Sequence, residues 1–331
     1  MAPTDLPDTL RLSLLDRSRT RRGEPHATAL EDTLRRAEHA DRLGYHRLWT
    51  AEHHSVPGIA SGSPPLLLAA AGARTHRIRL GSGGVMMPNH RPLVVAGQFA
   101  MLEAMYPGRI GLGVGRSLGF TAPVREALGV TEYDGDEFSR DITALQEFLH
   151  GRGPVTSMPV LEEPPPVFVL ATGRGLQVAA GLGLPVVAGG PRLLADPVPL
   201  ERYRESFRPN ATGSEPYVVI SLEVMIADSR DAARELLLPE AWAMVESRET
   251  GVFDALQPPG QILRRTFRPQ QMRRIENWMA TTVHGDAAAV AEELAELVAR
   301  TGADEIMAST STYDRDDLAR ADAALAELIP G

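Results

Sequence analysis

Cysteine and lysine are both absent from the 331 residues of the chain, so every basic side chain other than histidine is an arginine. Without cysteine, disulfides, thiolate catalysis, cysteine-ligated zinc and iron–sulfur clusters are excluded. Without lysine, the usual pyridoxal-phosphate chemistry, which needs a Schiff-base lysine, and the phosphate-binding lysine of a P-loop are excluded as well.

Long apolar runs and an excess of positive charge are also missing. No run of about 18 apolar residues is present to span a bilayer, and the first residues, MAPTDLPDTLRL, lack the apolar core of a signal peptide. The formal net charge of −9 argues against binding to nucleic acid or to a membrane surface. We therefore expect a cytoplasmic protein.

Apolar segments with strand-like patterns alternate with helical ones along the chain. The predicted strands cover residues 10–16, 46–52, 77–87, 109–115, 166–173, 185–190, 217–227 and 303–310. Helical spacing or composition predicts helices at 28–43, 64–73, 92–106, up to 182, near 195–207, at 286–301 and at 314–328. Short joints between them indicate right-handed βαβ units and a parallel sheet. Eight strands, each followed by a helix, favour a closed (β/α)8 TIM barrel over a doubly wound sheet.

Two joints are too long for simple connections in a single barrel domain of residues 1–331. Residues 116–165, after the fourth strand, include a predicted helix near 134–150, and residues 229–285 follow the seventh strand. Long excursions from a compact domain are usually lids or binding loops. We expect insertions at both places, and residues 249–280 as a lid.

The triplet Glu52-His53-His54 stands at the end of the second predicted strand. In a parallel barrel the chemistry lies at the carboxyl ends of the strands. Successive residues of a strand point to opposite faces, which disfavours a metal ion shared by the two imidazoles, and we predict no metal site. A purely structural reading, one histidine packed under a loop and the other solvated, stays open, but the position at a strand end favours a functional role.

A second group of polar and glycine residues follows the fourth and fifth strands. The segment GLGVGRSLG (111–119) lacks the third glycine of a dinucleotide fingerprint, because Arg116 stands in its place. In ATGRGL (171–176), Thr172 offers a hydroxyl group, and Gly173 and Gly175 let backbone N–H groups approach a ligand at a helix start. Together with Arg116 and Arg174 this turn predicts an anion site, although a simple helix cap would also explain it.

Several stretches resemble the bacterial-luciferase-like flavin monooxygenase family over nearly the whole chain. They are LRLSLLDRS, HRLWTAEHHSVPGIASGSP, RIRLGSGGVMMPNHRPLVVAGQFAMLEAMYPGRIGLGVGR, the ATGRGL turn before GLGLPVV, and TGADEIMASTSTYD. The resemblance is weakest over residues 229–280. It implies a (β/α)8 barrel that binds reduced FMN at its mouth.

The resemblance also implies roles for individual residues. Glu52 and His53 would lie beside the isoalloxazine ring, with His53 as the catalytic histidine. Gly83-Gly84, followed by Val85, matches the position of a non-proline cis peptide against the flavin, where glycine avoids crowding by a side chain.

The remaining expected contacts are with the phosphate, the ribityl chain and the ring. Arg116, Thr172 and the amides of Gly173 and Gly175 match the phosphate contacts of the family, and Leu118 and Val169 match contacts with the ring and the ribityl chain. Many relatives have Ser-Ser where Ala171-Thr172 stands, so one hydroxyl group is missing and Arg174 would replace it. The reactive cysteine of luciferase has no counterpart.

The implied reaction is the oxygenation of an organic substrate, of a biosynthetic kind, through a C4a-(hydro)peroxyflavin formed from reduced FMN and molecular oxygen. An imidazole titrates near neutral pH, so His53 would exchange the required proton. A separate flavin reductase would supply reduced FMN, since no nicotinamide fingerprint is present, and helices 64–75 and 92–106 would form a homodimer interface. Two alternatives remain: an oxidoreductase that uses the deazaflavin F420 on the same barrel, and a flavin-binding protein without turnover.

Overall fold

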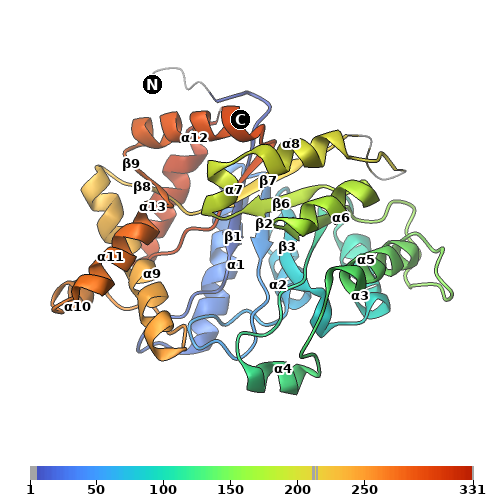
Figure 1. The fold of residues 1–331 in the computed structure, drawn as a ribbon, viewed down its shortest axis with the longest axis horizontal. Helices are drawn as coiled ribbons and strands as arrows, with labels where there is room; N and C mark the ends of the chain where they lie inside the picture. Colours follow the sequence, from blue (N-terminus) through green and yellow to red (C-terminus); the bar gives the residue numbers. More distant parts are fainter. Residues whose placement is uncertain (1–5, 211–212, 214, 330–331) are drawn as a thin grey trace.

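The computed structural model describes residues 6–210, 213 and 215–329. Within this part of the chain, eight parallel strands close a barrel in the order β1-β10-β7-β6-β5-β4-β3-β2 (Figure 1). The strands are β1 Arg11–Asp16, β2 Arg47–Thr50, β3 Arg79–Met86, β4 Ile110–Gly115, β5 Val167–Ala171, β6 Val186–Gly189, β7 Val218–Leu222 and β10 Glu305–Ala308. The predicted (β/α)8 barrel is confirmed.

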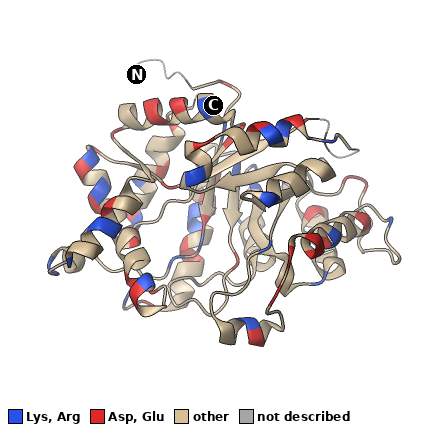
Figure 2. Ribbon diagram, in the orientation of Figure 1, with Lys and Arg blue, Asp and Glu red and all other residues tan. Residues whose placement is uncertain are grey.

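Helices surround the barrel between successive strands. They are α1 His26–Leu43, α2 Pro64–Gly72, α3 Pro92–Met105, α4 Ala122–Leu128, α5 Gly135–Leu149, α6 Arg174–Leu182, α7 Pro191–Ala195, α8 Val198–Glu205, α12 Ala287–Thr301 and α13 Arg315–Ala326. The single helix predicted near 195–207 is wrong in detail, because two short helices meet at Pro197, which serves as the N-cap of α8. Charged residues of both signs are interspersed along the outer helices (Figure 2). Within the described part of the chain, no helix combines the length and apolarity that a membrane span requires.

Buried apolar side chains form two separate clusters, one inside the barrel and one between the strands and the surrounding helices. Trp49, Phe168, Val187, Val219 and Met307 form the interior cluster, whereas the main core joins the outer faces of the strands to the helices. The large interior side chains explain the glycines of β3 and β4. A Cβ atom on Gly81 would lie 2.5 Å from the Trp49 ring, a distance that close packing does not allow.

A buried carboxylate closes the end of the barrel that lies away from the strands' carboxyl ends. Glu305 accepts hydrogen bonds from Arg47 at 3.0 Å, from Trp49 Nε1 at 3.3 Å and from the Tyr217 hydroxyl at 2.9 Å. A buried charge is tolerated when it is paired and hydrogen-bonded in this way. This end of the barrel is therefore plugged, and the opposite mouth remains for a ligand.

The insertion after β7 begins earlier than predicted. The expected strand 217–227 is wrong, because β7 ends at Leu222 and a separate two-stranded sheet follows, formed by β8 Val224–Ile226 and β9 Val283–Gly285. Helices α9 Arg230–Thr250, α10 Pro259–Leu263 and α11 Pro269–Met279 complete the insertion and share an apolar cluster of their own around Leu237 and Trp242. The residue at the break is Glu223, which lies at the mouth of the barrel.

Candidate active site at the mouth of the barrel

Glu52 is a buried residue at the mouth whose carboxylate accepts hydrogen bonds from several neighbours. Strand β2 ends at Thr50, two residues before the predicted end, so Glu52 and His53 belong to the following loop. The Glu52 side chain is fully buried, and its carboxylate accepts a hydrogen bond from His54 Nε2 at 2.8 Å. His54 is therefore a hydrogen-bond partner of Glu52.

The other partners of Glu52 come from the end of β3 and the turn after it. The Met86 backbone N–H and Asn89 Nδ2 each donate at 2.9 Å, and His90 Nε2 lies 2.9 Å from Oε2 and 3.0 Å from Oε1. Burial alone would raise the pKa of Glu52, but the hydrogen bonds from His90 and Asn89 outweigh it and hold the pKa below its ordinary value. The carboxylate thus stays ionised and ties the β2 loop to the end of β3. Asn89 and His90 were not predicted as site residues.

His53 lies in the loop after β2 with its ring stacked on Phe120, at 5.6 Å between ring centroids and 17° between planes. Its Nδ1 atom is buried and has no hydrogen-bond partner among the described residues. Burial and the positive charge of Arg17 lower the pKa of His53 to about 4. The expectation that this imidazole titrates near neutral pH is therefore wrong, and at pH 7 His53 is a neutral hydrogen-bonding group.

The Gly83-Gly84 peptide bond is cis, at the position that the resemblance indicated. The backbone is tightly enclosed there. A Cβ atom on Gly84 would lie 2.8 Å from the Gly113 carbonyl oxygen and 3.0 Å from the Leu170 side chain. Only glycine leaves room at this point for β3, β4 and the interior side chain of Leu170 to meet.

A cavity of about 440 Å³ opens at the carboxyl ends of β3, β4 and β5. Five residues predicted for cofactor binding line it: Arg116, Leu118, Ala171, Thr172 and Gly175. The lining also includes residues that were not predicted, namely Met86, Gly115, Ser117, Tyr133 and Leu170. The structure thus brings together the two segments from which the sequence predicted an anion site.

Six residues predicted for cofactor binding do not line this cavity: Gly83, Gly84, Val85, Val169, Gly173 and Arg174. Val85 and Val169 are buried in the main core between strands and helices, because alternate residues of a strand point to opposite faces. The neighbouring side chains of Met86 and Leu170 line the cavity, and the contact expected between Val169 and the ring or ribityl chain stays a prediction. Gly173 and Arg174 stand at the start of α6, next to the cavity, and both are exposed.

The donor set of the cavity suits a phosphate ester. Arg116 supplies a guanidinium group and Thr172 a hydroxyl group, and the positive end of the α6 dipole is at the same place. A Cβ atom on Gly175 would lie 2.9 Å from the Ala171 Cβ, so glycine lets the start of α6 approach β5. Apolar walls from Met86, Leu118 and Leu170 offer contact to a flat ring.

The opposite side of the mouth carries a chain of buried and half-buried ion pairs. Arg17 Nη2 lies 3.0 Å from Glu223 Oε1 and 3.2 Å from Glu240 Oε1, and Arg19 Nε lies 2.9 Å from Glu240 Oε2. Sequence reasoning missed this group, because Glu223 was placed inside a long strand. The signal that could have found it is the single carboxylate in the otherwise apolar run SLEVMIA.

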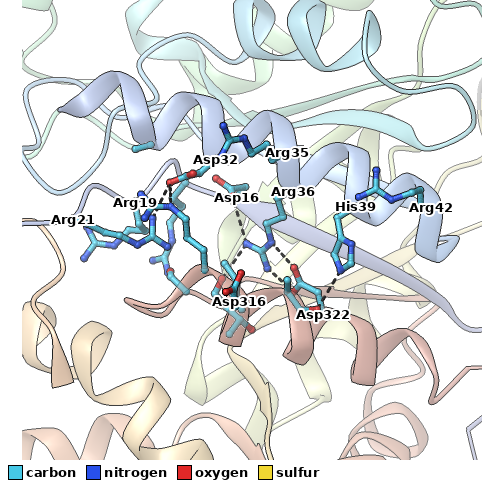
Figure 3. A pocket seen from close by; sticks show the side chains of 17 residues that line it. Asp16, Arg19, Arg21, Asp32, Arg35, Arg36, His39, Arg42, Asp316 and Asp322 are labelled. Carbon is cyan, nitrogen blue, oxygen red and sulfur yellow. Dashed lines mark hydrogen bonds and ion pairs between the residues drawn. The ribbon is translucent and has the colours of Figure 1, made fainter. Parts of the chain in front are cut away.

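A further cavity of about 310 Å³ lies between α1 and α13 and is lined by many charged side chains (Figure 3). Its charges largely satisfy one another. Arg36 donates to both oxygens of Asp322 at 2.8 Å and to Asp16 at 3.1 Å, and Asp32 accepts from Arg21 at 3.1 Å. This cavity is a salt-bridged groove between two helices and was not predicted as a site.

Part of the predicted lid, residues 251–257, is hydrogen-bonded to loops at the mouth. The Gly58 N–H donates to the Phe253 carbonyl oxygen at 2.8 Å, and the Leu256 N–H donates to the Thr20 carbonyl oxygen at 2.9 Å. The Arg19 guanidinium lies 4.2 Å above the Phe253 ring, and Leu256 is fully buried. The segment forms a wall of the mouth here, and its movement as a lid stays a prediction.

The chain is similar to known proteins over most of its length. The model of the luciferase-like monooxygenase family matches residues 11–305. A luciferase-like monooxygenase from Escherichia coli (strain K12) is 36% identical over 316 residues, which cover 92% of this chain and 93% of that protein.

Solved structures with the same fold bind different cofactors. The structure of apo-MsnO8 has a TM-score of 0.87 at 29% identity and covers 96% of this chain and 98% of its own. The oxygenating constituent of 3,6-diketocamphane monooxygenase from Pseudomonas putida, in complex with FMN, has a TM-score of 0.71 at 17% identity, covering 97% and 98%. An F420-dependent secondary alcohol dehydrogenase has a TM-score of 0.69 at 18% identity, with the same coverage. For the last two structures, at 17% and 18% identity, the similarity shows the fold alone.

Proposed function

Because the chain belongs to the luciferase-like monooxygenase family, we propose that it is an FMN-dependent monooxygenase that uses reduced FMN and molecular oxygen to oxygenate an organic substrate. The observation that carries this proposal is the cavity at the ends of β3, β4 and β5. It joins a guanidinium group, a hydroxyl group and a helix start to apolar walls, a combination that suits a phosphate ester on a flat ring.

The residues of the mouth have distinct roles in this proposal. Reduced FMN, when bound, activates oxygen so that one oxygen atom is transferred to the substrate. Arg116 and Thr172 hold the phosphate, and the backbone of Gly83-Gly84 supports the ring. The Glu52 carboxylate fixes the β2 loop to the end of β3 through Met86, so that His53 is held beside the ring.

Water must be kept away from the reacting atoms, because a site that excludes water prevents side reactions such as hydrolysis. The aromatic ring of Phe120 covers His53, and the wall formed by residues 251–257 closes the mouth on the side of Arg19. Phe120 itself is 65% exposed, and none of the residues of α4 is buried. The loop that carries Phe120 is therefore the part of the mouth best able to admit a substrate.

Two partners complete the proposal. A separate flavin reductase supplies reduced FMN, and a second copy of the chain packs against α2 and α3. Several large apolar side chains of these helices face solvent in the single chain: Leu66 at 73%, Val94 at 53%, Met101 at 55% and Met105 at 50% exposure. Exposed apolar groups that lie close together mark interaction surfaces.

Binding of the two candidate cofactors tests the proposal directly. The purified protein is titrated with reduced FMN and with reduced F420, and oxygen consumption is then followed. We expect binding of FMN and consumption of oxygen. Binding of F420 alone, with hydride transfer and no use of oxygen, would establish the second candidate, which the F420-dependent neighbour of the same fold supports. Retention of flavin with neither reaction would indicate a binding protein.

A further inference from the structure

The proposed roles leave the carboxyl group of Glu223 unused. Glu223 follows the last residue of β7 and precedes β8, so the chain leaves the barrel at this residue. Its Oε1 accepts a hydrogen bond from Arg17 Nη2 at 3.0 Å. Its Oε2 is buried and has no hydrogen-bond partner in the described structure. Buried polar atoms in proteins are nearly always paired, so an unpaired carboxyl oxygen at a strand end points to a ligand or a reactant.

Arg17 holds this carboxyl group in place from the end of β1. The same Nη2 atom that binds Glu223 also donates to the Ser309 carbonyl oxygen at 3.2 Å and lies 3.3 Å from Ser311 Oγ, both after β10. It further pairs with Glu240 at 3.2 Å. Arg17 is therefore shared between two carboxylates, and it neutralises Glu223 only in part.

Glu223 and His53 belong to the same side of the mouth. The strands β7, β10, β1 and β2 are successive neighbours in the barrel, and Arg17, which follows β1, contacts Glu223 after β7 and Ser309 after β10. Its charge is strong enough at His53 to contribute to the lowered pKa of that imidazole. The unpaired atoms His53 Nδ1, Arg17 Nε and Glu223 Oε2 thus come from three strand ends within one arc of the mouth.

The surroundings of Glu223 favour its protonated form. Burial raises the pKa of Glu223 to about 7. The charge of Arg17 opposes this rise and the charge of Glu240 adds to it, while Ser309 and the charge of Arg19 lower the pKa. Glu240 has the opposite response, because Arg19 and Arg17 hold its pKa below the ordinary value against the effect of burial. Two groups whose pKa values are driven apart are typical of an acid and its counter-charge.

On the basis of the proposed function, we propose that Glu223 is a proton-exchanging residue of the reaction site and that Arg17 is its positioning residue. The O–H bond at Oε2 breaks, its electron pair stays on the carboxylate, and the proton passes to an oxygen or nitrogen atom of the bound reactants. Arg17 stabilises the carboxylate that remains, and water returns the proton. His53, neutral at pH 7, contributes a hydrogen bond but no charge.

The first test uses the cofactor-free protein and does not depend on its activity. Carboxyl ¹³C resonances of glutamate-labelled protein are followed from pH 4 to pH 9. We expect one resonance that titrates near pH 7 and disappears in Glu223→Gln. In Glu240→Gln the same resonance should titrate at lower pH, because a neighbouring negative charge has been removed. A Glu223 resonance that titrates below pH 5 in the wild type would overturn the inference.

The second test measures hydrogen peroxide released from reduced FMN and oxygen without an organic substrate, as a function of pH. In the wild type we expect the rate to fall about tenfold per pH unit above pH 7. In Glu223→Gln the rate at pH 6 should be lower by about 10²-fold and should be almost independent of pH. Glu223→Asp should restore the pH dependence of the rate. Glu240→Gln should keep this pH dependence, but the fall in rate should begin at a lower pH. FMN affinity should be unchanged in all three variants, because the phosphate cavity is on the other side of the mouth.

The outcomes separate this inference from the proposed function. If Glu223→Gln has the wild-type pH profile, Glu223 is only a structural counter-ion to Arg17, and the monooxygenase proposal stands. If the wild type consumes no oxygen with reduced FMN, the proposed function and the inference both fail. A pH dependence that vanishes in Glu223→Gln and returns in Glu223→Asp supports the inference, since a structural ion pair would not produce it.

Discussion

Replacing Glu52 with glutamine should destabilise the protein far more than the same change at its surface. The Glu52 carboxylate accepts four sets of hydrogen bonds, from Met86 N at 2.9 Å, Asn89 Nδ2 at 2.9 Å, His54 Nε2 at 2.8 Å and His90 Nε2 at 2.9 Å. Glutamine keeps the size of the side chain but turns one acceptor oxygen into an NH₂ group. In either orientation of the amide, at least one buried donor then faces another donor.

The magnitude follows from these contacts. A buried donor left without an acceptor costs about 1–3 kcal/mol. At least two remaining hydrogen bonds change from charge-assisted to neutral, which costs about 1 kcal/mol each. We therefore expect Glu52→Gln to lower the free energy of unfolding by about 3–5 kcal/mol in urea titrations at pH 7.

The matched control is Glu31→Gln, which removes a carboxylate that binds Arg74 through two hydrogen bonds on the surface. Exposed ion pairs contribute little, so the urea midpoint should not move. Because the pKa of Glu52 is lowered in the folded protein, its stabilisation is present above the unfolded pKa of about 4.3 and is lost as pH falls through the lower folded value. The difference between wild type and Glu52→Gln should thus shrink below about pH 4. Equal effects of the two substitutions at pH 7 would refute the buried network.

Three further predictions concern the proposed phosphate site, His53 and assembly. Arg116→Ala should weaken FMN binding at least tenfold and leave riboflavin binding nearly unchanged, because only FMN carries a phosphate; equal losses in titrations of both ligands would contradict the phosphate assignment. His53→Ala should keep FMN affinity but lower product yield by about 10²-fold, the typical loss for one preorganised hydrogen-bonding group, with hydrogen peroxide released instead; an unchanged yield would remove His53 from the reaction. Light scattering should find a homodimer at micromolar concentration, and Met101→Glu on the exposed face of α3 should give monomers; a monomeric wild type would exclude the interface.

The sequence alone was sufficient for the barrel and for placing part of the candidate site at its mouth. Alternating apolar segments with short joints specify parallel βαβ units, since each strand and helix must bury one apolar face. The carboxyl ends of such strands meet at one mouth, so Glu52, His53, Arg116 and Thr172 could be assigned to it without coordinates. The errors arose where a local pattern is ambiguous. The run YVVISLEVMIA reads as one strand, but the chain leaves the barrel at Glu223.

Only the tertiary structure decided which groups surround each functional side chain. Arg17 and Glu223 lie 206 positions apart in the chain, and Glu52 meets His90 across 38 positions. No spacing rule connects such pairs. The protonation states follow from such contacts between residues far apart in the sequence. Burial and the charges of distant residues lower the pKa of His53 to about 4 and raise that of Glu223 to about 7. Residue types therefore identify the candidates for proton exchange, whereas the electrostatic field of the folded chain selects among them.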